Sequence, residues 1–439
     1  MPSKRSRRQE LSVRATTAFN KMLAIPGATV TGITFTSEGI VVSIRLRAQR
    51  LRCRCGWSTR ARYDSSTRQW RHLDVGASRL YLRARIRRLA CRRCARVVTE
   101  DVPWARPGAR FTRDFEDVVA WLAQRTDRTS ITRLLRCSWE SVTAIIERVV
   151  AEAINAERLD HVYRIGVDEI SYRSGHRYLT VVADHDRAGA VLWAGEGRNA
   201  AALGKFYEVL GPQRCQRIEA VSMDMAGAYA KATRDHAPQA RQCVDPFHVV
   251  KLANEALDAT RRWCWNNARG GRPKPKAEGK RGWGTASTRP GTMAHDIKNT
   301  RWALLKDPRH LHESQRAVLE QLRGQRHVLW RAYLLKEELR DLFRLPDPSL
   351  AAERLRLWLS RACRSRIPAM VRLSRTIRLH QTRILDAITL GLSNSKLEGL
   401  NSRVRLINHR GYGHHSAAAI IALIYLNCGG ITVELPTGR

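Results

Sequence analysis

Alternating apolar and polar residues in the first hundred positions predict a small β-domain. The β-branched runs at 28–40 and 41–48, with Gly39 between them, are typical of two strands joined by a turn. The run SRLYLRARIRRLAC at 78–91 alternates apolar residues with arginine, which predicts one strand with a core face and a cationic face. We therefore expect a basic N-terminal β-domain over residues 1–105.

The pattern changes to helical periodicity after residue 110. Apolar residues recur at i, i+3, i+4 and i+7 behind Thr112, which is placed to cap the helix, and a short helical segment follows at 130–136. Ser138, with a glutamate close behind it, predicts the start of a longer helix at 139–153. This order is that of a helix-turn-helix over 106–156 with 139–153 as recognition helix; three helices that merely link two domains are the alternative.

Residues 157–250 predict an α/β core. Three β-branched runs at close spacing are followed by a helix, a strand, a second helix and a short strand, at 162–170, 177–186, 188–197, 200–210, 218–225, 226–236 and 240–245. Three antiparallel strands followed by alternating helix and parallel strand are the order of a ribonuclease-H-like core.

A long helical stretch then interrupts this core. Residues 251–390 keep helical periodicity except for a Gly/Pro/Lys-rich segment at 268–291, which predicts a mobile basic loop. Helical periodicity resumes in 391–439, which we assign to the final helices of the core. The predicted fold class is therefore multidomain α+β, with a β-domain, a helix-turn-helix and an α/β core interrupted by an all-α insertion domain.

Charge narrows the class of partner. The 439 residues include 78 Lys and Arg against 40 Asp and Glu, a net charge of +38, so a polyanion is the expected partner. Neither a signal peptide nor an apolar run of about 18 residues occurs, which excludes secreted and membrane-spanning classes. We expect a cytoplasmic protein that associates with the nucleoid when it is bound to DNA.

Four of the ten cysteines form two close pairs. Cys53 and Cys55 precede a strand-rich stretch, and Cys91 and Cys94 follow it, which is the layout of a zinc ribbon with one structural Zn²⁺. The first pair is one residue shorter than the usual knuckle. Four reduced thiols in a small β-domain are the alternative.

Two aspartates point to a second metal site. Asp168 ends the first strand of the core and Asp224 ends the fourth, and parallel neighbours place both at the same edge of the sheet. In 395–407 the apolar stripe is Leu397, Leu400, Val404 and Ile407, and Glu398, Asn401 and Arg405 form the adjoining stripe. Glu398 can supply a third hard oxygen ligand, which suits two Mg²⁺ or Mn²⁺ ions.

Other polar positions near this edge have weaker assignments. Glu169 points to the opposite face if the strand continues, and Asp184 has a turn role before Asp186. Asp245 and His248 could assist at a scissile phosphate, with a helix cap and a packed histidine as the alternative.

Several motifs resemble one known family. The strings DEISYRSGHRYLTVVAD, MDMAGAYAKA, CVDPFHVVKLANEALD and SNSKLEGLNSRVRLINHRGYG are similar to those of the ISL-three family of bacterial insertion-sequence transposases. The resemblance covers about 50 to 428 and includes that family's zinc finger and helix-turn-helix. It implies a DDE transposase in which Asp168, Asp224 and Glu398 bind the metal ions.

The resemblance also implies partners and DNA contacts. A DDE transposase binds terminal inverted repeats, cuts the DNA and joins its 3′-hydroxyl to target DNA, and it works as a homodimer or higher oligomer. The residues expected to contact DNA are Arg83, Arg85, Arg87, Arg88, Ser141, Thr143 and Arg410, with Asn401, Arg405, Asp245 and His248 as possible auxiliary residues. A DNA-binding regulator with a decayed core and a structure-specific nuclease are the rival functions.

Overall fold

A computed structural model describes residues 14–173, 175–187, 189–268, 293–324, 328–411 and 416–438, without the side chains of 293, 395–398 and 438. The predicted mobile loop at 268–291 lies outside the described residues apart from its first position. The chain divides into two compact units, one of residues 1–155 and 406–439 and the other of residues 156–405. None of the described helices is long and apolar enough to cross a membrane.

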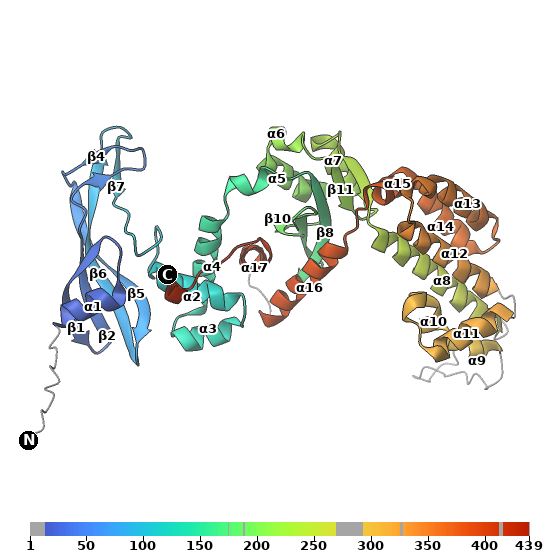
Figure 1. Cartoon of the computed structure of the whole chain (residues 1–439), viewed down its shortest axis with the longest axis horizontal. Coiled ribbons are helices and arrows are strands. Elements are labelled where there is room, and N and C mark those ends of the chain that lie inside the picture. Colours follow the sequence, from blue (N-terminus) through green and yellow to red (C-terminus); the bar gives the residue numbers. More distant parts are fainter. Residues whose placement is uncertain are drawn as a thin grey trace, which may run out of the picture. The chain divides into compact units, whose positions relative to one another are not determined.

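The first unit begins with a β-sheet and one short helix (Figure 1). The sheet has the order β1-β2-β6-β5, and β7 pairs with the end of β6. Apolar residues of β6 are buried and its arginines are mostly exposed, as the alternation predicts. The elements are α1 (Ala15–Leu23), β1 (Ala28–Thr36), β2 (Gly39–Leu46), β3 (Leu51–Arg52), β4 (Ser58–Thr59), β5 (Asp64–Val75), β6 (Ser78–Cys91) and β7 (Arg96–Thr99).

Three helices follow where the periodicity places them: α2 (Arg113–Ala123), α3 (Arg128–Leu135) and α4 (Trp139–Ala153). The hydroxyls of Thr112 and Ser138 accept backbone N–H groups of Phe115 and Ser141, so both predicted caps are confirmed. Apolar residues of α2 and α4 share one core with α17 (Ala417–Cys428).

The second unit contains a five-stranded mixed sheet of order β10-β9-β8-β11-β12. Neighbours β8 and β9 are antiparallel, whereas β8, β11 and β12 run parallel, so the predicted strand pairing is confirmed. The strands are β8 (Arg164–Arg173), β9 (Arg177–Asp184), β10 (Val191–Glu196), β11 (Ala220–Met223) and β12 (Arg241–Val244), with α5 (Ala200–Leu210), α6 (Pro212–Cys215) and α7 (Gly227–His236) between them.

Different helices cover the two faces of this sheet. Val167 of β8 and Val221 of β11 lie in the core formed with α5 and α7 (Figure 1). Ala220, which precedes Val221 in β11 and so points to the other face, packs instead with Cys243 of β12 against Ala387 and Leu392. Ala387 lies in α15 and Leu392 just after it. Because side chains alternate between faces, even-numbered residues of β8 and β11 point toward the α15 side.

Helices fill the stretch between β12 and the last part of the chain. Their shared core includes Leu257, Leu339, Trp358 and Ile377. The helices are α8 (Pro246–Ala268), α9 (Met293–Lys298), α10 (Arg301–Leu305), α11 (Glu313–Gly324), α12 (Val328–Asp341), α13 (Ala351–Arg364), α14 (Pro368–Leu379) and α15 (Gln381–Leu390), and α16 (Ser395–Arg410) follows them.

Candidate functional site

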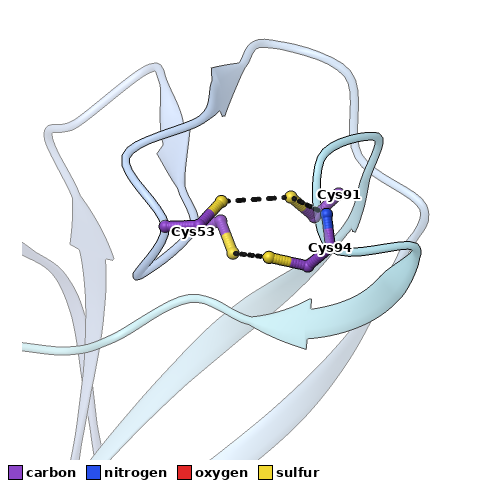
Figure 2. A group of neighbouring side chains, drawn as sticks. Cys53, Cys91 and Cys94 are labelled. Carbon is purple, nitrogen blue, oxygen red and sulfur yellow. Dashed lines mark hydrogen bonds between the residues drawn. The ribbon is translucent and has the colours of Figure 1, made fainter.

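The four paired cysteines lie together at the end of the β-domain. Cys53 and Cys55 lie between β3 and β4, Cys91 is the last residue of β6, and Cys94 lies in the turn before β7. Figure 2 shows Cys53, Cys91 and Cys94 together. The four sulfur atoms are all within 4.8 Å of one another, with Cys55 Sγ 3.5 Å from Cys91 Sγ. Four thiolates around one Zn²⁺ have sulfurs about 3.8 Å apart, given a Zn–S bond of about 2.3 Å. The short Cys53-x-Cys55 spacing therefore does not prevent a tetrahedral set.

The electrostatics of this cluster fit a cation. A backbone hydrogen bond involving Trp57 lowers the pKa of Cys55 to about 7, whereas the hydrogen bond with Cys55 raises the pKa of Cys94 to about 12. A first thiolate thus forms readily, but its charge opposes the next one. Four thiolates at such distances need a positive ion at their centre.

Strand register brings the predicted aspartates to one edge of the sheet. Ser222 of β11 pairs with Gly166 of β8, so Asp224 and Asp168, each two residues further on, lie level on neighbouring strands and on the same face. Val244 of β12 pairs with Met223, which places Asp245 level with Asp224. Three aspartates thus lie in a row across β8, β11 and β12, where adjacent strands are about 4.8 Å apart.

Asp168 does not end its strand as predicted. Strand β8 continues to Arg173 because β9 pairs with it antiparallel beyond Asp168, opposite Val181. Only the parallel pairing with β11 ends before Asp168. The alternation of side chains along β8 then sends Glu169 to the other face, as expected for a strand that continues.

The negative charge of this edge is reflected in the groups around it. Burial raises the pKa of Glu169, and the charges of Asp224 and Asp168 raise it further. Burial likewise raises the pKa of Tyr229 to about 12, and the charges of Glu169, Asp224 and Asp168 add to the shift. Carboxylates this close are stabilised by a bound cation.

Helix α16 touches Asp168. The side-chain amide of Asn401 donates to Asp168 Oδ2 at 2.5 Å. The amide oxygen of Asn401 is buried and has no hydrogen-bond partner within the described residues. An unpaired oxygen beside a carboxylate is a fitting ligand for a hard cation. Glu398 lies three residues earlier in α16, and its side chain is outside the described residues.

The stripe predicted for α16 is found in its described part. Leu400 and Val404 are buried, and Arg405 is exposed. The side chain of Leu397, like that of Glu398, lies outside the described residues.

A buried asparagine anchors the start of α16, and no local sequence pattern points to this role. Asn394, 4% exposed, donates its backbone N–H to Asp245 Oδ1 at 3.1 Å. Its side-chain oxygen accepts the hydroxyl of Ser222, and its Nδ2 is 3.5 Å from the backbone oxygen of Val167. Ser222 Oγ is in turn 2.6 Å from His185 Nε2. This network joins α16 to three strands of the sheet.

The auxiliary pair has a structural role of its own. Asp245, 4% exposed, also accepts the N–H of Phe247 at the start of α8, and His248 Nε2 is 3.9 Å from its Oδ2. Burial raises the pKa of Asp245. The geometry thus contains the helix cap that we considered as the alternative, and it adds the bond to Asn394.

Arg383 is a second residue that the sequence did not single out. It lies on α15 and donates Nη2 to the backbone oxygen of Asp224 at 3.1 Å. Its Nε is buried without a partner within the described residues, and burial lowers its pKa. A guanidinium group with an unused donor beside Asp224 can take a phosphate oxygen.

Two other polar predictions differ in their outcome. Asp184 is fully buried and accepts the N–H of Asp186 at 2.8 Å, which confirms its turn role. Ser138 caps α4 by accepting the backbone N–H of Ser141, the third residue of the helix. A capping box requires a glutamate at that third position, whereas Glu140 is the second residue, so the capping-box prediction is wrong.

The four arginines of β6 that we predict to contact DNA differ in their partners within the described residues. Arg87 pairs with Glu100 at 2.7 Å and Arg88 pairs with Asp64, whereas Arg83 and Arg85 contact only the neutral side chains of Gln69 and Ser65.

The two residues of the helix-turn-helix that we predict to contact DNA form hydrogen bonds within their own helix or its cap. Ser141 Oγ is 3.1 Å from the cap Ser138, and Thr143 donates to the backbone oxygen of Trp139. Arg410, at the end of α16, is exposed.

Comparison with known proteins agrees with this architecture. The family model for DDE transposases of the ISL3 (ISL-three) type, described as a transposase, matches residues 165–424. A model for the helix-turn-helix domain of transposase family ISL3 matches residues 100–150, and a zinc-finger model for transposases of IS204, IS1001, IS1096 and IS1165 matches residues 54–94. The chain therefore belongs to the ISL3 family of transposases.

Individual relatives extend over most of the chain. It is 41% identical over 404 residues to the transposase for insertion sequence element IS1557 of Mycobacterium tuberculosis, which covers 90% of each chain. It is 28% identical over 361 residues to the transposase for insertion sequence element IS1001 of Bordetella parapertussis, covering 82% of this chain and 84% of that one.

Proposed function

We propose that this transposase cleaves DNA at the ends of its insertion sequence and joins the freed 3′-hydroxyl to target DNA, with Asp168, Asp224 and Glu398 as catalytic metal ligands. One observation carries the proposal: strand register places Asp168 and Asp224 side by side, and α16 contacts Asp168 one turn from Glu398. The fold proposed for this core is ribonuclease-H-like, interrupted by an all-α insertion over 251–390.

The residues at the sheet edge have distinct tasks in this proposal. Asp168 and Asp224 supply hard oxygen ligands, and Asn401 holds Asp168 in one orientation. Two Mg²⁺ or Mn²⁺ ions, when bound, supply activation of a water or 3′-hydroxyl and stabilisation of the leaving oxygen. Asp245 and Asn394 fix the start of α16. His248 and Arg405 are proposed as auxiliary residues that contact the DNA.

The DNA-binding parts are assigned by the same logic. The four cysteines hold a structural Zn²⁺ and shape the end of the β-domain, 1–105. Arg83 and Arg85 are the first candidates for phosphate contacts because Arg87 and Arg88 already have carboxylate partners. The remaining proposed DNA contacts are Ser141 and Thr143 of the helix-turn-helix, 106–156, and Arg410 at the end of α16.

The proposed partners are terminal inverted repeats and target DNA in the bacterial cytoplasm. Two ends must be brought together before strand transfer, so we propose a homodimer or higher oligomer on DNA.

A plasmid assay distinguishes this function from its rivals. A supercoiled plasmid that carries the element's own ends is incubated with the full chain and Mg²⁺. The proposal predicts both cut DNA and joined product. Binding without cleavage would indicate a regulator, and cuts without joined product would indicate a nuclease; either result would contradict the proposal.

A further inference from the structure

Eight arginines and one glutamate lie in the helical hairpin formed by α13 and α14, over residues 351–379, which we call the arginine hairpin. The described residues between 293 and 350 have ten Lys or Arg against eight Asp or Glu. The positive charge of this region is therefore concentrated in one hairpin.

These arginines are available to a partner. All eight are exposed, and Arg361, which pairs with Glu338 at 2.7 Å, is the only one with a carboxylate partner among the described residues. Elsewhere between β12 and α13 exposed arginines do pair with carboxylates: Arg262 with Asp258, Arg309 with Asp307 and Arg323 with Glu320. Unpaired charges crowded together repel one another, so the fold gains nothing from them unless a polyanion binds.

The spacing on α14 forms a continuous cationic side. Arg372, Arg375 and Arg378 recur every third residue, while Leu373 and Ile377 between them are buried. A 12-residue helix is about 18 Å long, which matches roughly five phosphates of one strand of duplex DNA. Arginine is also the residue best suited to bidentate phosphate contacts.

A groove adjoins the hairpin where α13 turns toward α14. It has a volume of about 520 Å³ and is lined by Arg331, Leu334, Leu335 and Glu338 of α12 together with Arg361, Arg364, Ser365 and Arg366. Four arginines against one glutamate make it an anion-attracting groove.

The hairpin is connected to the catalytic edge by α15. This helix follows α14, packs on the sheet beside Cys243 of β12, and carries the Arg383 that contacts Asp224. The hairpin is therefore joined directly to the helix that contacts Asp224.

We propose that the arginine hairpin is a further DNA-binding surface, which holds the phosphate backbone of a duplex without reading its sequence. The proposal rests on the proposed function, because it assigns a second contact region to the same DNA substrate. It lies outside the zinc ribbon and the helix-turn-helix, so its contribution is independent of end recognition.

The test is the salt dependence of binding by the full chain to a 40-base-pair duplex of random sequence, without divalent ions. Each phosphate contact contributes about 0.9 to the slope of log K against log salt. The variant R372Q/R375Q/R378Q is expected to lose roughly 3 from this slope and at least tenfold in affinity at physiological salt. The charge-retaining variant R372K/R375K/R378K is expected to keep the slope.

The matched control is R262Q/R309Q/R323Q, which removes the same charge from arginines of similar exposure that already have carboxylate partners. If the two glutamine variants changed the slope equally, the hairpin proposal would be wrong while the transposase function stood. If the unmodified chain did not bind the duplex at all, both the hairpin proposal and the proposed function would be overturned.

Discussion

Asp224 is the residue whose chemistry is most readily isolated. Replacing it with asparagine keeps the side-chain shape and an oxygen that can accept the backbone N–H of Ala226, but removes the charge of a proposed metal ligand. We expect Asp224→Asn to abolish cleavage while DNA binding stays within a few-fold of the unmodified protein. Gel-shift and plasmid-cleavage assays measure both.

Asp235→Asn is the control for this variant, because Asp235 is an exposed aspartate on α7. It should cleave normally. Normal cleavage by Asp224→Asn would remove Asp224 from the metal site.

Asn394 tests whether the position of α16 matters to catalysis. Asn394→Ala loses the bonds to Ser222 and Val167, each worth about 1 kcal/mol, and loosens the helix start. We expect cleavage to fall at least tenfold and the Mn²⁺ concentration for half-maximal cleavage to rise, with DNA binding unchanged. A metal titration of cleavage measures this shift.

Arg403→Ala serves as comparison, since Arg403 is exposed on the same helix. An Asn394→Ala protein with the unmodified metal dependence would show that Asn394 does not position the site.

Residue patterns predicted the two aspartates but not their supports. Asp168 and Asp224 follow buried runs, and this pattern is visible in the sequence. Asn394 and Arg383 act through contacts with residues more than 150 positions away, so no local pattern reveals them.

At the scale of elements, the four cysteines join the β3–β4 and β6–β7 segments in one cluster, which we expect to depend on zinc. Cys91→Ser removes a ligand, and we expect loss of bound zinc, local unfolding of β3, β4 and β7, and weaker DNA binding. Zinc content by atomic absorption and amide protection by hydrogen exchange measure the two effects.

Cys363→Ser is the control, because Cys363 is exposed on α13 and distant in sequence from the cluster. Full zinc content in Cys91→Ser would contradict the four-cysteine site.

A buried ion cluster joins the loop before α2 to the helix-turn-helix. Arg106, 7% exposed, contacts Glu116, Asp117 and Glu152 at 3.2, 2.7 and 2.7 Å. Arg106→Ala removes a cation that contacts the buried carboxylates of Glu116 and Asp117, while Arg148 still pairs with Glu116. We therefore expect a loss of about 3 kcal/mol of unfolding free energy. Urea denaturation of the variant measures the loss.

The exposed Arg110, four residues later, provides the comparison through Arg110→Ala, which should change stability by less than about 0.5 kcal/mol. Equal stability of the two variants would show that the cluster adds nothing.

Elements were predictable where periodicity was strong. Helix α4, which we predict to be the recognition helix, has the predicted bounds, and the strand pairing of the core follows the predicted order. The extension of β8 past Asp168 was missed because it depends on pairing with β9, which no property of β8 alone reveals.

At the scale of the whole molecule, charge indicated the partner before any fold was known. The net charge of +38 predicts a polyanion, and the structure adds that seven of the eight arginines in the arginine hairpin have no carboxylate partner among the described residues. Composition gives no location, because paired and unpaired arginines look alike in the sequence.

The joint position of three carboxylates, the last about 170 residues beyond the second, is the central claim. Crystals of the full chain with DNA, soaked in Mn²⁺, test it through anomalous scattering at the manganese edge. We predict manganese peaks bound by Asp168, Asp224 and Glu398 together. Manganese bound without Glu398, or no peak at the two aspartates, would contradict it.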